Sequence, residues 1–176
     1  MSSVLVVVGG LPASGKSTVA RALAEQIQAP YLRVDRIEQA IVAWSSLAHP
    51  VGPAGYAVAH QLAAEQLALG LDVVVECVNP NATTRDAWVG TGSAGGAAVV
   101  EVELSCSDAA EHRRRVESRV SDVEGLLKPT WDEVLGREYE PWTRSHLGLD
   151  TAAVPVGWLV KRIASEIESA RAGLSA

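Results

Sequence analysis

The chain has 176 residues, of which 48% are hydrophobic and 20% are charged, and its formal net charge is −6. This composition is typical of a globular protein, and the length favours one domain over residues 1–176 with a sizeable core. The negative charge disfavours a long nucleic acid as partner, because proteins that bind one neutralise its phosphates with a basic surface. No apolar run approaches the roughly 20 residues of a membrane span, so we expect no membrane partner.

Cysteine and histidine usage argues against a zinc site. Cys77 and Cys106 lie in or beside apolar runs, and the four histidines are scattered along the chain. Neither cysteine belongs to a pair with metal-ligand spacing. Residues 1–3 lead directly into the first predicted strand, which leaves no room for a signal peptide. We therefore expect a cytoplasmic protein with reduced thiols, as a monomer or a homodimer.

The segment GLPASGKS at residues 10–17 matches the phosphate-binding pattern GxxxxGK[ST] at every fixed position. It follows a predicted buried strand at 4–8 and precedes a predicted helix at 16–28, which is the context that a P-loop requires. Lys16 would reach the β- and γ-phosphates of ATP, and the Ser17 hydroxyl would coordinate Mg²⁺. The residues predicted to bind the nucleotide in this segment are Gly10, Ala13, Ser14, Gly15, Lys16, Ser17 and Thr18.

The remaining pattern alternates strands with helices. Strands are predicted at 31–34, 72–77, 98–104 and, weakly, 145–150. Helices are predicted at 35–44 with Trp44 on the inner face, at 56–69, after Pro80, at 108–120, at 130–139 and after Pro155, with a loop at 90–96. Alternation of this kind predicts an α/β fold of three layers, with a parallel sheet covered by helices on both sides. Ligands bind such a fold at the carboxyl ends of the strands.

Two acidic residues fall at predicted strand ends. Asp35 follows the second strand, where it could accept the proton of an attacking hydroxyl or hold a Mg²⁺-bound water; alternatively, it caps the next helix. Glu76 closes a run of three valines, which is the pattern of an acid that holds Mg²⁺ through water; the alternative is a solvated strand end. The sequence leaves the division of labour between the two acids open.

Arginines surround a polar segment late in the chain. Arg115 and Arg119 are four residues apart on one predicted helix, and Arg137 follows the polar segment. Arginines on both sides of a movable segment are typical of a phosphate lid, here at about residues 120–131, which would make Arg115 and Arg119 catalytic. Alternatively, the cluster is a solvated face paired with neighbouring glutamates. Arg113 is expected to be either a surface residue or a contact for the adenine.

The acceptor pocket is predicted near the second and third strands. Arg36 follows Asp35, and Asn79 and Arg85 follow the third strand, where Arg85 could read an anionic group. Together with Asp35 and Arg137, these residues form the predicted substrate site. The alternative for the segment after the third strand is helix capping plus a core tryptophan, Trp88.

With these motifs assembled, the chain resembles the small P-loop kinases of the nucleoside-monophosphate-kinase-like fold. It is most similar to the group of adenylylsulfate kinase, gluconate kinase, chloramphenicol phosphotransferase and zeta-toxin kinases. Residues 75–80 (VECVNP) and 137–142 (REYEPW) also resemble members labelled AAA-family ATPases. The resemblance implies a five-stranded sheet in the order 2-3-1-4-5, with a short lid after the fourth strand. It implies that Asp35 is the catalytic acid and that Arg115 and Arg119 are lid arginines.

These observations predict an enzyme that moves the γ-phosphoryl group of MgATP to a hydroxyl of a small metabolite or antibiotic. Two alternatives remain open. One is a 5′-hydroxyl kinase of nucleic acid or of a nucleotide-linked sugar. The other is an ATP-dependent switch or binding module with no acceptor of its own.

Overall fold

The computed structural model describes residues 2–119, 125 and 128–174, and its centre is a five-stranded parallel sheet. The spatial order is β2 (Tyr31–Arg33), β3 (Val73–Glu76), β1 (Val4–Gly9), β4 (Ala98–Ser105) and β5 (Leu147–Asp150). The predicted order 2-3-1-4-5 is therefore confirmed. Every residue of β1 and β3 is buried, as expected for valine-rich strands covered on both faces.

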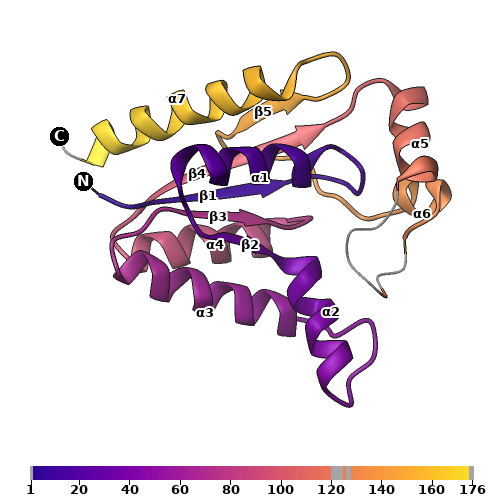
Figure 1. Ribbon diagram of the computed structural model, residues 1–176, viewed down its shortest axis with the longest axis horizontal. Helices are drawn as coiled ribbons and strands as arrows, with labels where there is room; N and C mark the ends of the chain where they lie inside the picture. The colour runs from indigo at the N-terminus through magenta and orange to yellow at the C-terminus, as the bar shows by residue number, and fades with distance from the viewer. Residues whose placement is uncertain (1, 120–124, 126–127, 175–176) are drawn as a thin grey trace.

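Two helices cover each face of the sheet (Figure 1). α1 (Lys16–Ile27) and α7 (Val156–Leu174) pack together on one face, and their apolar side chains form a core with β1 and β4. α3 (Ala54–Ala68) and α4 (Ala82–Ala94) cover the other face around Trp88. The three-layer α/β prediction is thus confirmed. Within the described ranges, no helix is long and apolar enough to cross a membrane.

Three further helices lie outside the layers. α2 (Val34–Trp44) projects from the sheet edge that β2 forms, whereas α5 (Ala109–Ser118) and α6 (Trp131–Leu135) lie together beyond the carboxyl ends of the strands (Figure 1). Trp44 is 91% exposed, so its prediction as a core residue was wrong, because α2 extends past the sheet that would have covered it. Most of the predicted lid at 120–131 lies outside the described residues.

Two predicted boundaries were also wrong. The segment at 90–96 is not a loop for most of its length, because α4 continues to Ala94. A Cβ at Gly92 would lie 2.3 Å from Val99 Cγ2, so glycine here permits close packing of helix on sheet rather than a turn. The helix predicted at 130–139 ends at Leu135, and Gly136 is its C-cap.

Candidate active site

The P-loop joins β1 to α1 at the carboxyl edge of the sheet, and its backbone requires glycine at two positions. Gly10 has φ 141°, and a Cβ there would lie 2.2 Å from the carbonyl oxygen of Leu104. Gly15 has φ 96° and is the N-cap of α1. No side chain of the described residues caps that helix. The first N–H groups of α1 are therefore available to an anion.

Three carbonyl groups of the loop accept hydrogen bonds from side chains, two of which lie outside the loop. Lys16 Nζ donates to Leu11 O (2.7 Å), His112 Nε2 on α5 donates to Pro12 O (2.8 Å), and Thr151 Oγ1 donates to Ser14 O (2.8 Å). Thr151 directly follows β5, so α5 and the end of β5 both fix the loop backbone. These bonds hold the loop in one shape before any phosphate arrives, which reduces the ordering cost of binding.

We expect Thr151→Val to weaken ATP binding about fivefold, the effect of losing the one hydrogen bond that its hydroxyl makes to the loop. Valine keeps the volume but removes the hydroxyl that holds Ser14 O and accepts from Arg115 Nη1 (2.9 Å). Isothermal titration calorimetry with ATP measures the change. Thr91→Val is the matched control, because the Thr91 hydroxyl bonds His60 on the outer surface of α3 and α4. An equal loss of affinity in both variants would contradict the role of Thr151.

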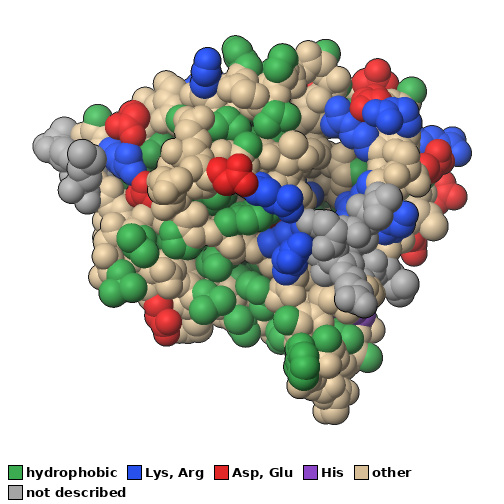
Figure 2. Space-filling view, in the orientation of Figure 1, with side chains coloured by type: hydrophobic (Ala, Val, Ile, Leu, Met, Phe, Trp, Pro, Cys, Tyr) green, Lys and Arg blue, Asp and Glu red, His purple; other side chains and the backbone are tan. Residues whose placement is uncertain are grey.

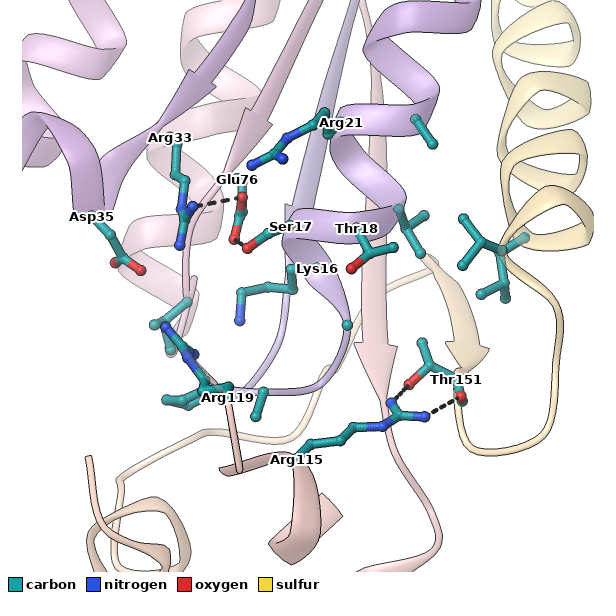
Figure 3. Close-up of a pocket in the computed structure, with 18 of the residues that line it drawn as sticks. Lys16, Ser17, Thr18, Arg21, Arg33, Asp35, Glu76, Arg115, Arg119 and Thr151 are labelled. Atoms are coloured by element: carbon teal, nitrogen blue, oxygen red, sulfur yellow. Dashed lines mark hydrogen bonds and ion pairs between the residues drawn. The ribbon is translucent and has the colours of Figure 1, made fainter. Parts of the chain in front are cut away.

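The loop and its surroundings fit a nucleotide and a magnesium ion. Ser14 Oγ is buried and has no hydrogen-bond partner among the described residues, which indicates a hydroxyl that is available to a ligand. Ser17 Oγ donates to Glu76 Oε1 (2.6 Å), so a hydroxyl and a carboxylate, the oxygen ligands that Mg²⁺ prefers, lie together beside the loop (Figure 3). Glu76 is 3% exposed, so the alternative of a solvated strand end was wrong.

Glu76 has two further partners, both from β2. Tyr31 Oη donates a short hydrogen bond to Glu76 Oε2, and Arg33 Nε lies 3.6 Å from the same oxygen. Burial, and then the charge of Glu76, raise the pKa of Tyr31 far above its usual value, so the phenol remains a donor. Sequence reasoning missed Tyr31 and Arg33. The sequence feature that could have indicated them is their two-residue spacing in the strand preceding Asp35, which places both side chains on one face of the sheet.

Lys16 and Asp35 lie on opposite sides of the same cleft (Figure 3). Burial lowers the pKa of Lys16, and the carboxylates of Glu76 and Asp35 partly offset this by favouring the charged amine. Asp35 lies in the first turn of α2, and the N-cap of that helix is Arg33. The alternative of a capping aspartate was therefore wrong, and the Asp35 carboxylate faces the cleft (Figure 3).

Glu38, one turn after Asp35, is a second cleft residue that sequence reasoning missed. Burial, and then the neighbouring charge of Asp35, raise its pKa. The i, i+3 spacing from Asp35 could have found it, since residues three apart share a helix face. The cleft therefore holds two carboxylates on α2 in addition to Glu76.

The cleft has a volume of about 1000 Å³ and a positive lining. Six lysine and arginine side chains line it against four carboxylates, although the whole chain has a net charge of −6. Figure 2 shows basic side chains gathered around the hollowed end of the molecule. A local positive field in an acidic protein favours a small anionic ligand over a long nucleic acid.

The two predicted lid arginines have different surroundings. Arg115 donates to Glu111 Oε1 (2.7 Å) and, through both terminal nitrogens, to Thr151 Oγ1 and O (2.9 Å each). Arg119 points into the cleft near Lys16 (Figure 3) and lines it together with Arg137. Arg113 instead pairs with Glu117 on the exposed side of α5, away from the cleft lining. The alternative of a surface residue is therefore confirmed for Arg113, and its predicted adenine contact has no support in this placement.

Arg85 lies outside the cleft, contrary to its predicted role in reading an acceptor. Its guanidinium donates to the carbonyls of Asn79, Pro80, Glu140 and Pro141. The Arg85 Cζ atom also lies 4.2 Å from the centre of the Trp142 ring. Because its donors are occupied by backbone, the residue joins the start of α4 to the segment between α6 and β5.

The other predicted acceptor residues divide in the same way. Asn79 is fully buried after the end of β3, against Gly9, and Arg36 is exposed; neither lines the cleft.

The segment after β3 has a structural role. Trp88 is fully buried, and Asn81 forms a capping box with Thr84 at the start of α4. The alternative of helix capping plus a core tryptophan is therefore confirmed, and only Asp35 and Arg137 of the predicted substrate set lie in the cleft.

We expect Arg85→Ala to lower the free energy of unfolding by about 3 kcal/mol, because it removes a buried side chain and leaves four carbonyls, that of the buried Asn79 included, without their donor. Urea denaturation measures the loss. Arg162→Ala is the control; Arg162 forms a half-exposed i, i+4 pair with Glu166 on α7, and its removal should cost less than about 1 kcal/mol. Unchanged stability in Arg85→Ala would contradict the structural role.

The fold and the loop define the chain as a P-loop protein of the kinase-like type. The AAA domain family matches residues 5–134, and the chain belongs to this family. Comparison with curated protein sequences finds no match.

Solved structures share the fold at low sequence identity. A Chloroflexus aurantiacus protein aligns with TM-score 0.77 and 18% identity, over 96% of this chain and 98% of that chain. A Sinorhizobium meliloti gluconokinase aligns with TM-score 0.64 and 21% identity, over 96% and 95%. The Mycobacterium tuberculosis APS kinase, solved with AMPPNP and APS, aligns with TM-score 0.65 and 18% identity, over 95% and 98%.

Proposed function

We propose that this protein is an ATP-dependent phosphotransferase that moves the γ-phosphoryl group to a hydroxyl of a small metabolite or antibiotic. One observation carries the proposal: a carboxylate, Asp35, and two arginines, Arg119 and Arg137, line one cleft with the P-loop lysine. A site that only binds a nucleotide needs no more than the P-loop. A site that transfers phosphate also needs a base opposite the γ-phosphate and cations around it.

The residues divide the work as follows. The P-loop backbone and the start of α1 bind the phosphates, and Lys16 neutralises charge at the γ-phosphate. Asp35 accepts the proton of the acceptor hydroxyl, so that the oxygen can attack in line. Arg119 stabilises charge that develops on the transferring group, and Arg137 faces the acceptor side. Arg115 acts through Thr151 and holds the loop rather than the phosphate.

Ser17 and Glu76 would hold Mg²⁺, Glu76 through a water molecule. When bound, this ion would supply positive charge that offsets the charge of the phosphates. The donor set supports this assignment, because Ser17 Oγ and Glu76 Oε1 lie 2.6 Å apart beside the loop.

Small acceptors fit the cleft better than polymers. Its volume of about 1000 Å³ suits a nucleotide with one small molecule. The gluconokinase and the APS kinase that share this fold also support a small acceptor. Their sequence identity to this chain is too low to assign the acceptor of either enzyme to it.

ATP turnover against a panel of sugars, nucleosides, aminoglycosides and phenicols tests the proposal. We expect one class to raise ADP release and to gain a phosphate by mass spectrometry. Lys16→Ala protein is the blank. ADP release that no small molecule changes, but that a protein partner does, would overturn the proposal in favour of a switch.

A further inference from the structure

The Glu76 carboxylate uses its two oxygens on different sides. Oε1 accepts from Ser17 Oγ at 2.6 Å, on the side of the P-loop. Oε2 accepts from the phenol of Tyr31 and lies 3.6 Å from Arg33 Nε, on the side of β2. The side chains of Arg33 and Glu76 are each 4% exposed, so these contacts are made in a nearly water-free environment.

Strand pairing explains why β2 supplies both partners. In the parallel register of β2 and β3, Arg33 is paired with Glu76, and Tyr31 is two residues earlier. Residues two apart in a strand project from the same face, so both side chains reach one carboxylate. A buried carboxylate held at one oxygen by a phenol and a guanidinium has lost most of its rotational freedom.

We propose that Tyr31 and Arg33 are positioning residues for magnesium: they hold Glu76 by Oε2 and so keep Oε1 beside Ser17 Oγ on the metal side. The inference rests on the proposed function only in that MgATP is the nucleotide bound. Tyr31 is not among the residues that line the cleft, whereas Arg33 lines it with its Nε 3.6 Å from Glu76 Oε2. Partners that orient a ligand in this way alter metal affinity about 10- to 100-fold.

The charges around Glu76 add a second consequence. Arg33 and Lys16 lie close to Glu76 and Asp35, and Figure 3 shows Arg21 directed from α1 toward the same carboxylate. These cations offset the carboxylates, so the site has no excess negative charge to attract a free divalent ion. Ser17 and Glu76 would therefore hold the ion only together with a polyphosphate, which supplies the missing negative charge.

Tyr31→Phe tests the positioning role because it removes one hydroxyl and leaves the ring and every charge. Calorimetry measures ATP affinity in EDTA and across a Mg²⁺ titration. We expect the Mg²⁺ concentration for half-maximal tightening to rise about tenfold, with the affinity in EDTA unchanged. Tyr139→Phe is the matched control: its half-buried hydroxyl accepts from Trp142 outside the cleft, and its Mg²⁺ titration should match wild type.

Arg33→Lys provides an independent variant, since it keeps the charge while losing the guanidinium geometry. Thermal melts in EDTA establish that each variant is folded. An unchanged Mg²⁺ titration in folded Tyr31→Phe would overturn the inference, as would an equal loss of affinity with and without metal. Missing phosphoryl transfer with intact MgATP binding would overturn only the proposed function.

Discussion

Replacement of Lys16 by alanine is expected to lower phosphoryl transfer about 10²- to 10³-fold, the usual effect of removing one preorganised charge from a transition state. Lys16 is 8% exposed, and its ammonium is directed along the loop by a hydrogen bond to Leu11 O. A buried cation acts in a low local dielectric, where water does not screen it. A coupled assay of ADP release with the identified acceptor measures kcat.

Two variants isolate the charge of Lys16 from the loss of a side chain. Lys161→Ala removes an exposed lysine of α7, outside the cleft, and should leave kcat unchanged. Lys16→Arg keeps the charge but not the compact geometry, and should recover part of the activity. Turnover in Lys16→Ala within about twofold of wild type would exclude Lys16 from transition-state stabilisation, because a charge at the γ-phosphate is worth far more.

The P-loop and the sheet could be predicted because their signals are local or topological. The loop pattern occurs between a valine-rich run and a helix, and each step of that reading uses adjacent residues. Alternation of strands with helices predicts a parallel sheet covered on both faces, but right-handed crossovers alone are compatible with more than one strand order. The order 2-3-1-4-5 was predicted from the resemblance to known kinases, and the sheet has this order.

Arg85 shows where such reading fails. An arginine after a strand end is compatible both with an anion pocket and with a structural role, and sequence alone does not say where its guanidinium points. The partners that decide the matter include Glu140 and Pro141, more than fifty residues away. Their approach depends on how the chain returns from α6 to β5, a long-range feature that no local pattern encodes.

Tyr31, Arg33 and Glu38 were missed for a related reason. Each has a helix or strand spacing that is visible in the sequence, but its meaning depends on which neighbour it faces. Arg33 faces Glu76 only through the register of β2 on β3. A buried arginine beside a buried glutamate is costly unless both are paired, so the register, once known, requires the contact.

Asp35→Asn is expected to lower kcat about 10²- to 10⁴-fold while ATP affinity changes less than about twofold, because a general base acts on the acceptor and not on the nucleotide. Asparagine keeps the size of the side chain and removes its ability to take a proton. Single-turnover transfer measures the chemical step, and calorimetry measures binding. A wild-type rate in Asp35→Asn would exclude this residue as the base.

Glu38→Gln makes the comparison decisive, because Glu38 lies one turn away in the same cleft. Its pKa is raised by burial and by the charge of Asp35, so as the base it would lose its proton only at a higher pH than an ordinary glutamate. If Glu38 were the base, the transfer rate would therefore begin to fall, as the pH is lowered, at a higher pH than with an ordinary glutamate. We expect instead that Glu38→Gln retains most of the transfer rate, and that Asp35→Asn loses it. The reverse result would assign proton transfer to Glu38 and leave Asp35 as the neighbour that raises the pKa of Glu38.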